Sequence, residues 1–440
     1  MWDGRAARAR RAWGRRRVLA SVMLALSASA FSVTAATASA TSGGAALGNG
    51  TRHSPRPAHA APHRRRATTS RAHPNPLAAR GMWIWLLADS NGGDVASIIA
   101  TAHRYGISTL MIKSGDGSTV LSQFNRPLVS ALHANGLRVC AWQYVYGAHP
   151  ISEAYVGAAA VSDGADCLLI DAESEYETQP DNYVQAQTYI AWLRKLIGAN
   201  FPVALAGLPY VDYHPAFPYS VFLGPGGAQY NAPQMYWADI GTTVDGVYAH
   251  TYAYNEIYRR SIFPLGQVYA DPPPPQIFRF RQLSRLYGAS GVSWWDWQEA
   301  ALSGWVALSR PAGSLPGRAD PAMASISLHA QGDVVVWAQE HLIGAGYRIS
   351  VDGGFGPQTL AAVHSFQRAH GLAVDGIVGP LTWNALLRYA PPPIHWVPAG
   401  AQIASAARSS LTMPVPKSSR LPAKRDEIAG AGGAGMPRGR

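Results

Sequence analysis

Eight short apolar runs recur between residues 82 and 297, and this recurrence constrains the fold more than any other feature of the chain. The stretches between the runs carry helical periodicity, most clearly over 183–197 and 276–287. Eight alternating strand–helix units in about 230 residues fit a closed (β/α)8 barrel better than an open sheet. The expected strands are Met82–Ala88, Thr109–Lys113, Arg138–Tyr146, Cys167–Asp171, Pro202–Ala206, Ala232–Trp237, Pro264–Tyr269 and Gly291–Trp297.

The loop after the first expected strand argues against nucleotide binding. A doubly wound sheet that binds a dinucleotide places a glycine-rich turn at this point. This chain has Leu87-Ala88-Asp89-Ser90 there instead. We therefore predict an α/β chain with a TIM-like barrel and without a cofactor.

A segment from Ser325 to about Tyr389 contains an internal repeat. The eight residues that start at Asp352 recur 23 residues later, starting at Asp375. Each copy reads as an Asp-Gly turn, an apolar residue, Gly-Pro and then a Thr at a helix entry. The spacing predicts three short helices, over 334–344, 359–370 and 382–387.

This repeat, together with the opening Gly332-Asp333-Val334 and the dipeptide Gly346-Tyr347, resembles the type 1 peptidoglycan-binding domain. That family is a three-helix module common in cell-wall hydrolases. The resemblance implies that peptidoglycan, or a related N-acetylated polysaccharide, is the partner of the chain. Which residues of the module would contact the glycan or the stem peptide cannot be read from the sequence.

The charge of the chain belongs to its ends. Residues 1–77 carry 13 Arg and one acid, and residues 391–440 carry seven basic residues and two acids. Residues 78–390 carry 17 basic and 23 acidic residues, so the part that can fold is mildly acidic. A nucleic-acid-binding domain carries its basic patch on the fold itself, which argues against such a partner. We expect the basic ends to be solvated tails, with contacts to anionic wall polymers or membrane surfaces as the alternative.

The first 40 residues have the order of a secretory signal peptide. A basic segment, Arg5–Arg17, precedes the apolar segment Val18–Val33, and Ala38-Ser39-Ala40 provides an A-x-A cleavage site. The apolar run is short and contains Ser and Thr, which favours cleavage over a membrane anchor. We therefore predict a secreted, wall-associated monomer that has no stable membrane insertion once the signal is removed.

Composition divides the chain into six parts. Two Gly- and Pro-rich stretches, 41–77 and 311–324, have the character of linkers. The predicted organisation is signal peptide 1–40, linker 41–77, barrel 78–310, linker 311–324, binding module 325–390 and disordered tail 391–440.

The two cysteines, Cys140 and Cys167, both lie in apolar strand-like runs. A small disulfide-stabilised scaffold would have more cysteines. We expect two buried free thiols, with a disulfide between them as the alternative.

The fourth expected strand carries the strongest candidates for chemistry. Because strand side chains alternate, Leu169, Asp171 and Glu173 share one face, and the two acids emerge at the carboxyl end of the strand. Barrel enzymes place their active sites at that end. Acids two residues apart on one face have Cα atoms roughly 6.5–7 Å apart, so they repel, and one of them can retain a proton for general acid catalysis.

The Asp-x-Glu ending of this strand resembles glycoside hydrolase families 18 and 25, the chitinases and lysozymes. In family 18 terms, Glu173 would protonate the glycosidic oxygen, and Asp171 would orient the N-acetyl group that attacks the anomeric carbon. Gln234-Met235-Tyr236 resembles strand six of family 18, and Tyr236 would donate a hydrogen bond to the acetamide. Trp295, with its neighbour Trp294, would form the floor of the sugar subsite.

Three further polar residues, Lys113, Asp239 and Asp296, fall near expected strand ends and are candidates for substrate binding. We also predict that the site holds no metal, because the histidines are scattered and no His-Glu-x-x-His motif is present. A serine hydrolase would favour Gly-x-Ser-x-Gly at a strand–helix elbow, which Ala289-Ser290-Gly291 does not provide.

The sequence is therefore compatible with two classes of function. The first is a secreted, cell-wall-targeted glycosidase with an Asp-x-Glu pair. The alternative is a non-catalytic glycan-binding protein with a degenerate barrel, because Leu169 replaces an acid of the family 18 pattern and the first strand lacks the acid typical of family 25. The sequence does not distinguish a muramidase from a glucosaminidase.

Overall fold

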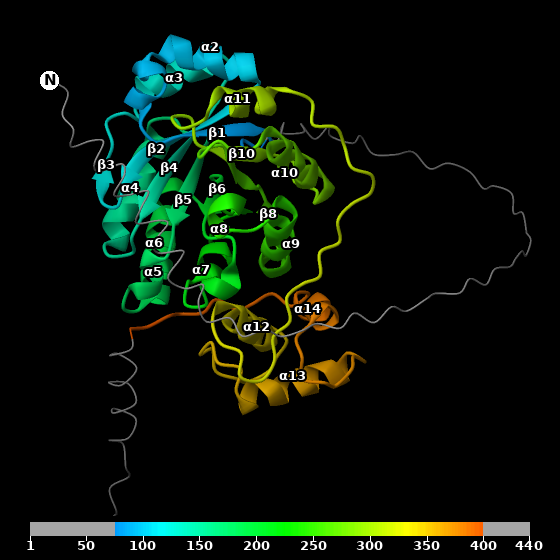
Figure 1. Cartoon of the computed structure of the whole chain (residues 1–440). Coiled ribbons are helices and arrows are strands. Elements are labelled where there is room, and N and C mark those ends of the chain that lie inside the picture. The colour runs from blue at the N-terminus through cyan, green and yellow to red at the C-terminus, as the bar shows by residue number, and fades with distance from the viewer. Residues whose placement is uncertain (1–74, 399–440) are drawn as a thin grey trace, which may run out of the picture. The chain divides into compact units, whose positions relative to one another are not determined.

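The computed structural model describes residues 75–398, and Figure 1 shows how their helices and strands are arranged. The predicted signal peptide, nearly all of the first linker and most of the C-terminal tail lie outside the described residues. Among the described residues, no helix combines the length and apolar character that crossing a bilayer requires.

Seven of the eight expected strands coincide with strands of the structure. The expected strand Ala232–Trp237 does not, because the strand lies just before it, at Tyr230–Asn231, and a helix begins at Trp237. Two short strands were not expected: antiparallel β3, which pairs with β2, and β8. The first run ends earlier than expected, because the chain turns into a short 3-10 helix at Leu87–Asp89. The strands are β1 (Arg80–Ile84), β2 (Thr109–Asp116), β3 (Thr119–Val120), β4 (Arg138–Val145), β5 (Cys167–Ala172), β6 (Val203–Ala206), β7 (Tyr230–Asn231), β8 (Ser261–Ile262), β9 (Leu265–Gln267) and β10 (Val292–Trp295).

The segment that contains β8 and β9 closes the sheet into a barrel. β8 pairs with β7, and Gln234, three residues beyond β7, forms a parallel bridge with Leu265 in β9. Backbone bonds from Phe263 to Asn231 (2.7 Å) and from Met235 to Leu265 (2.8 Å) continue this ladder. β9 also pairs with β10, and β10 pairs with β1. Eight parallel segments therefore form a ring, which confirms the predicted barrel.

Helices surround this ring and cover the outer face of the sheet (Figure 1). A proline occupies the first turn of α3, α4 and α10, where its missing N–H costs no hydrogen bond. The helices of the barrel are α2 (Val95–Tyr105), α3 (Arg126–Ala134), α4 (Pro150–Ser162), α5 (Glu175–Thr178), α6 (Asn182–Ile197), α7 (Tyr219–Leu223), α8 (Trp237–Ile240), α9 (Val244–Asn255), α10 (Pro274–Leu286) and α11 (Leu302–Ser309).

The interior of the ring has its own buried cluster, separate from the core beneath the helices. Trp83, Trp142 and Trp295 contact one another there, with ring centroids 5.4–5.8 Å apart. The indole N–H of Trp83 donates to Ser293 (3.0 Å), and that of Trp142 donates to the carbonyl of Ile84 (3.1 Å). These side chains fill the middle of the barrel and support whatever lies above them.

Cys140 and Cys167 form a disulfide inside the ring, so the expectation of two free thiols is wrong. The two residues are register partners on the adjacent parallel strands β4 and β5, with Cα atoms 4.6 Å apart. Both side chains belong to the interior cluster. Strand register brings the two thiols together, and the register between β4 and β5 could not be read from the sequence.

The C-terminal module consists of α12 (Asp333–Gly344), α13 (Pro357–Ala369) and α14 (Pro380–Leu386). The three expected helices are confirmed. Two of them begin two residues earlier than predicted, because the proline of each Gly-Pro pair occupies the first helical turn.

Each copy of the Asp-Gly repeat is closed by a glutamine from the preceding helix. Gln339 donates to the carboxylate of Asp352 (2.8 Å) and accepts from the backbone N–H of Gly353 (3.0 Å). Gln367 makes the same two bonds in the second copy, to Asp375 (2.8 Å) and to the glycine that follows it (3.0 Å). Both glycines have a φ of +72°, which other residues rarely adopt. The repeat therefore forms two turns with the same hydrogen bonds, each bonded to a glutamine of the preceding helix.

The described residues up to Trp396 form one compact unit, in which α12 packs against α7. The carboxylate of Asp333, the first residue of α12, is fully buried. It accepts hydrogen bonds from the hydroxyls of Tyr258 (2.7 Å), Tyr183 (2.9 Å) and Ser220 (2.7 Å), and from the backbone N–H of Ser220 (2.8 Å). Four donors offset much of the cost of burying this acid.

A second acid of α12, Glu340, is also buried, and burial raises the pKa of its carboxyl to about 9, with the charge of Asp333 adding to the effect. The folded protein therefore holds a proton that the unfolded chain releases, so the free energy of unfolding falls as pH rises from about 4.5 towards 9.

We predict that Glu340→Gln raises the melting temperature at pH 8 and changes it little at pH 4, because the amide never has to lose a proton. Thermal unfolding across this pH range measures the effect. Glu299→Gln, at an exposed acid, is the matched control. A gain of the same size at both pH values would contradict the prediction.

Candidate active site

Asp171 and Glu173 lie together at the carboxyl end of β5 and are joined by one side chain. Asp171 is 2% exposed and Glu173 is 9% exposed. The amide nitrogen of Gln234 donates to Asp171 Oδ1 (2.8 Å) and to Glu173 Oε1 (2.9 Å). A single nitrogen that bonds both carboxylates keeps the two acids close, as their spacing on the strand predicts.

Tyr144 and Glu175 extend this carboxylate pair towards β4. Tyr144 is the register partner of Asp171, and its hydroxyl donates to Glu175 Oε2 (2.7 Å). Burial and the nearby charges of Glu173, Glu175 and Asp171 raise the pKa of Tyr144 far above its ordinary value. Tyr144 is therefore a neutral hydrogen-bond donor at physiological pH.

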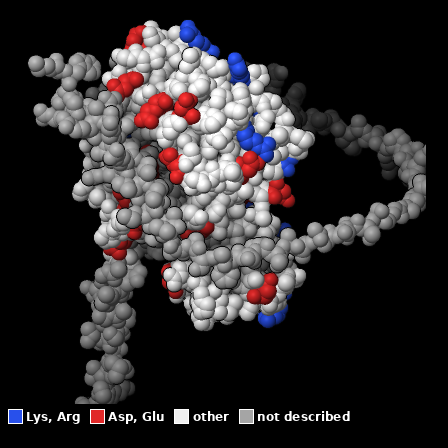
Figure 2. All heavy atoms as spheres, viewed as in Figure 1, with Lys and Arg blue, Asp and Glu red and all other residues white. Residues whose placement is uncertain are grey.

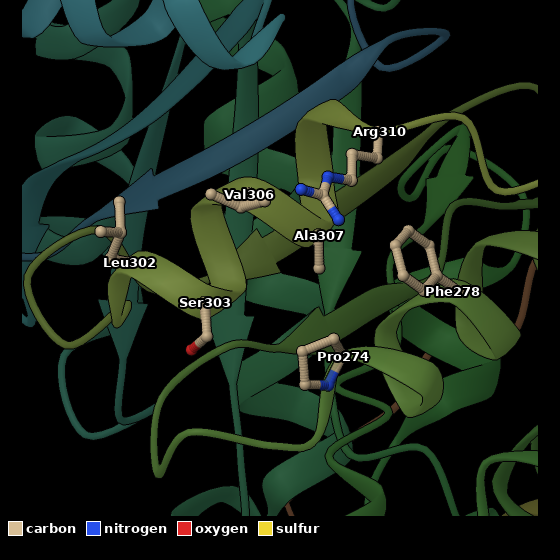
Figure 3. Close-up of a pocket in the computed structure, with 7 residues that line it drawn as sticks. All are labelled: Pro274, Phe278, Leu302, Ser303, Val306, Ala307 and Arg310. Carbon is tan, nitrogen blue, oxygen red and sulfur yellow. The ribbon is translucent and has the colours of Figure 1, made fainter.

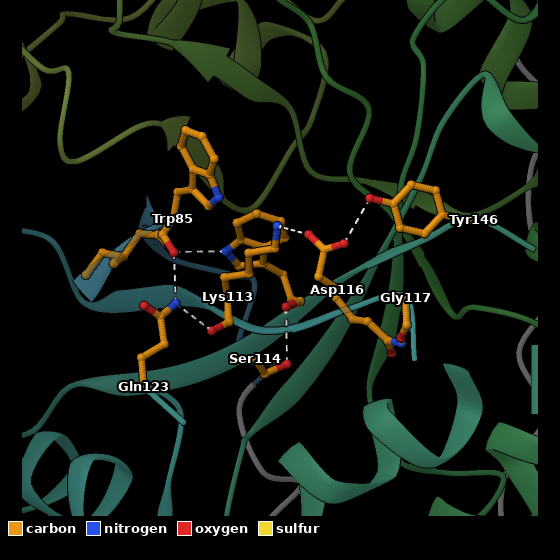
Figure 4. A network of polar contacts seen from close by, with 10 residues as sticks. Trp85, Lys113, Ser114, Asp116, Gly117, Gln123 and Tyr146 are labelled. Carbon is orange, nitrogen blue, oxygen red and sulfur yellow. Dashed lines mark hydrogen bonds and ion pairs between the residues drawn. The ribbon is translucent and has the colours of Figure 1, made fainter. Parts of the chain in front are cut away.

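Lys113 is a buried cation near the ring of Tyr144. Its ammonium group lies 2.6 Å from Asp116 Oδ2 and 5.0 Å from the ring centroid of Trp142 (Figure 4). The hydroxyl of Tyr146 donates to the other oxygen of Asp116 (2.9 Å). The side-chain amide of Gln123 donates to the backbone carbonyls of Lys113 and of Trp85 in the first barrel loop. Asp116 therefore links the lysine to an aromatic side chain at the rim.

Tyr236 and Trp295 face the interior cluster, where both are almost fully buried. Trp295 packs on the other two tryptophans of the ring. Tyr236 lies edge-on to Tyr269 with 5.6 Å between ring centroids, and the hydroxyl of Tyr269 donates to Asp239. The ring interior and its carboxyl end therefore contain five of the predicted residues: Lys113, Asp171, Glu173, Tyr236 and Trp295.

Trp294 and Asp296 lie differently from their neighbour Trp295. Trp294 is fully buried on the helix side of β10, where it packs on Phe280 of α10 at 5.1 Å. Asp296 is buried and accepts a hydrogen bond from the backbone N–H of Glu299 (3.3 Å). The structure thus keeps Asp296 beside the end of β10 and separates Trp294 from the site.

Sequence reasoning assigned no role to Gln234, Tyr144 or Gln267. The alternation of side chains along a strand could have identified two of them. Tyr144 lies two residues after Trp142 on one strand, and Gln267 lies two residues after interior-facing Leu265 on another. The carbonyl oxygen of Gln267 accepts from the backbone N–H of residue 238 (2.8 Å), whereas its amide nitrogen has no hydrogen-bond partner among the described residues. A buried donor therefore remains available near this end of the barrel.

A separate cavity of about 300 Å³ lies between α10 and α11, in the helical layer (Figure 3). Its lining is mainly apolar, includes Phe278 and Val306, and ends at Arg310. None of the predicted site residues lines it, so it is distinct from the carboxylate pair.

Charged side chains are sparse on the face of the molecule in Figure 2, and acids and bases lie scattered among uncharged residues there. Within residues 75–398, no group of three or more His, Cys, Asp or Glu side chains could hold a metal ion.

Comparison with known proteins identifies the C-terminal module. Residues 331–386 match the family model described as putative peptidoglycan binding domain, which confirms the predicted module. A zinc D-Ala-D-Ala carboxypeptidase of Streptomyces albus G is 56% identical over 43 residues, which are 10% of this chain and 17% of the relative. An uncharacterized protein of Kitasatospora aureofaciens is 69% identical over 36 residues, 8% of this chain and 30% of the relative. The chain spans less than a third of the length of these curated relatives.

Among solved structures, a family 18 chitinase of Pseudoalteromonas aurantia is similar over 52% of this chain and 97% of its own, at 13% identity and a TM-score of 0.40. The spore cortex-lytic enzyme of Bacillus megaterium is similar over 52% of this chain and 73% of its own, at 8% identity and a TM-score of 0.38.

The shared amide of Gln234 leads to a prediction about stability. Gln234→Leu should lower the free energy of unfolding by about 1–3 kcal/mol, because it leaves two buried carboxylates without their shared donor. Urea unfolding measures this loss. Gln276→Leu is the control, because Gln276 is exposed and accepts its hydrogen bond from the indole of Trp237, outside the carboxylate pair. A loss no larger than that of the control would contradict the prediction.

Proposed function

We propose that this chain is a secreted glycoside hydrolase that is targeted to the cell wall and cleaves an N-acetylated glycan, peptidoglycan in the first place. The observation that carries the proposal is the pair Asp171 and Glu173, held by one amide at the carboxyl end of a barrel strand. A module that matches a peptidoglycan-binding family lies in the same chain.

The two carboxylates can take different catalytic roles in glycoside cleavage. Glu173, the more exposed acid, gives its proton to the glycosidic oxygen. Asp171 remains charged and orients the acetamide of the substrate, whose carbonyl oxygen attacks the anomeric carbon as the bond to the leaving sugar breaks. This substrate-assisted route needs no protein nucleophile. Water then opens the cyclic intermediate and returns a proton to Glu173.

Other residues of the barrel suit the positioning of the sugar. Gln234 holds the two carboxylates together through hydrogen bonds from its one amide nitrogen. Tyr236 donates its hydroxyl to the acetamide, and Trp295 offers a rigid aromatic surface because two other indoles support it. Lys113, Asp239 and Asp296 are the remaining polar candidates for contacts with sugar hydroxyls.

A non-catalytic glycan-binding barrel is the second candidate function. Leu169, at a position where the family 18 pattern has an acid, is fully buried in the interior cluster. A site with fewer acids can still bind a sugar on its aromatic side chains, and the two candidates differ in turnover.

We predict that Glu173→Gln lowers the release of sugars from peptidoglycan by roughly 10²–10⁴-fold, because the amide has no proton to transfer. Mass analysis of soluble products from the purified mature protein measures this. Asp171→Asn should also be damaging, because the orienting role requires charge. Glu177→Gln is the control, since that acid pairs with His214 outside the carboxylate pair.

Wild-type turnover by the Glu173→Gln protein would refute the catalytic assignment. An inactive wild type that still binds peptidoglycan would favour the glycan-binding alternative.

We further predict that the full chain sediments with insoluble peptidoglycan and stays in the supernatant with cellulose, because the module supplies the affinity. The assay uses the protein with the Glu173→Gln substitution, so that binding is measured without cleavage. Equal recovery with both polymers would contradict specific targeting.

A further inference from the structure

We propose that Gln267 recognises the sugar at the point of cleavage, by donating its side-chain N–H to a hydroxyl oxygen of that sugar. Gln267 then determines specificity, because it selects a glycan that has a free hydroxyl at this position. This inference rests on the proposed function, since it concerns the sugar on which the carboxylate pair would act.

Gln267 is the last residue of β9, and its side chain lies inside the ring. It follows Leu265 of the interior cluster by two residues, and its register partner is Trp295 of the same cluster. Gly266, between the two β9 residues, faces the helical layer, because a Cβ atom there would lie 2.9 Å from the ring of Phe280. Since side chains alternate along a strand, the amide belongs to the interior.

The protein already holds one end of this amide. The carbonyl oxygen of Gln267 accepts a hydrogen bond of 2.8 Å from the backbone N–H of Ala238 in α8. Rotating the amide by half a turn would set its NH2 group against that N–H, so the oxygen stays on Ala238 and the nitrogen presents its N–H groups elsewhere. Because Tyr236 directly precedes α8, this bond also keeps Gln267 close to the predicted acetamide donor.

The amide nitrogen of Gln267 is a buried donor without a partner. Gln267 is fully buried, and its nitrogen is one of six buried side-chain atoms that have no hydrogen-bond partner among residues 75–398. The other five lie on helices or on the helix side of β10: Tyr176, Thr251, Tyr252, Trp294 and His341. Buried polar groups in folded proteins nearly always have a partner. A free donor at the carboxyl end of the ring therefore points to an acceptor on the substrate.

The chemistry of the proposed reaction limits which oxygen this donor can meet. The acetamide carbonyl has two lone pairs, of which one attacks the anomeric carbon and the other accepts from Tyr236. Trp295 covers a face of the sugar, so a donor on the neighbouring strand β9 meets the edge of the ring, where the hydroxyls lie. In a 1,4-linked N-acetylated pyranose, the free hydroxyls are those at C3 and C6. We therefore expect one of these two oxygens to be the acceptor.

A donor that is unpaired before binding makes the site selective. The N–H groups of Gln267 have already lost water, so a sugar oxygen that reaches them forms a bond without displacing a partner from the protein. A sugar that lacks this hydroxyl leaves the donor unpaired, and sites built to bond a hydroxyl reject such analogues strongly. Gln267 thus discriminates between sugars, whereas the carboxylate pair carries out cleavage.

The test asks whether Gln267 and one sugar hydroxyl form the same bond. In the full chain carrying Glu173→Gln, calorimetry with the tetrasaccharide of N-acetylglucosamine and with its 3-deoxy and 6-deoxy analogues gives affinities without turnover. We expect Gln267→Met to weaken binding of the parent tetrasaccharide roughly ten- to hundredfold. One analogue should lose a similar factor when Gln267 is intact. Combining that analogue with Gln267→Met should cost little more, because both changes remove one bond.

Tyr252→Phe is the matched control, because it removes another buried donor that has no partner among the described residues, on α9 in the outer layer. This variant should bind all three sugars as the parent protein does. The comparison of the three sugars with Gln267 intact needs no further substitution, so it decides the question even if Gln267→Met folds poorly.

Equal binding of the tetrasaccharide and both analogues, an unchanged affinity of Gln267→Met, or additive losses in the combination would each overturn the inference. No binding of any of the three sugars would also overturn it. If the wild type still releases sugars from peptidoglycan, these results leave the proposed function standing. A wild type without turnover defeats the proposed function, and the affinities alone then decide whether Gln267 recognises a sugar.

Discussion

Gln234 links the closure of the barrel to the arrangement of the candidate site. Its backbone forms the parallel bridge to Leu265 that completes the ring and donates to the carbonyl of Gly207 (3.0 Å). Its side chain bonds both Asp171 and Glu173. Because one residue makes both sets of contacts, the separation of the two acids depends on the register that closes the sheet. A barrel with shifted register would lose the shared donor and leave two buried carboxylates in mutual repulsion.

The aromatic layer inside the ring has a related consequence for the site. Three indoles and a disulfide occupy the volume beneath the acids, so ligand and water can approach the carboxylates from the rim but not through the barrel. Close packing of these large side chains also fixes the interior faces of β4 and β5. This rigid layer explains how Glu173, just beyond the end of β5, keeps a defined position relative to Tyr144 of β4.

Much of this arrangement could be predicted from the sequence, because it rests on local periodicity. Alternation placed Asp171 and Glu173 on one face, and the Asp-Gly repeat identified the module. The features that the sequence did not reveal depend on register between separate strands. The disulfide, the bond between Tyr144 and Glu175, and the outward direction of Trp294 all require knowing which residues lie opposite one another. A run of adjacent tryptophans does not state which of them faces inward.

The module joins the barrel through buried contacts whose separation would cost free energy. Asp333 is buried with four hydrogen-bond donors, three of them hydroxyls from three barrel elements. Removing the partner elements would leave α12 with exposed apolar side chains, including Trp337, whose indole donates to the carbonyl of Ile257 (2.8 Å). Buried polar contacts of this kind select one geometry more than they add stability. A flexible tether would need no such contacts, so the structure favours a module whose position on the barrel is set by specific bonds.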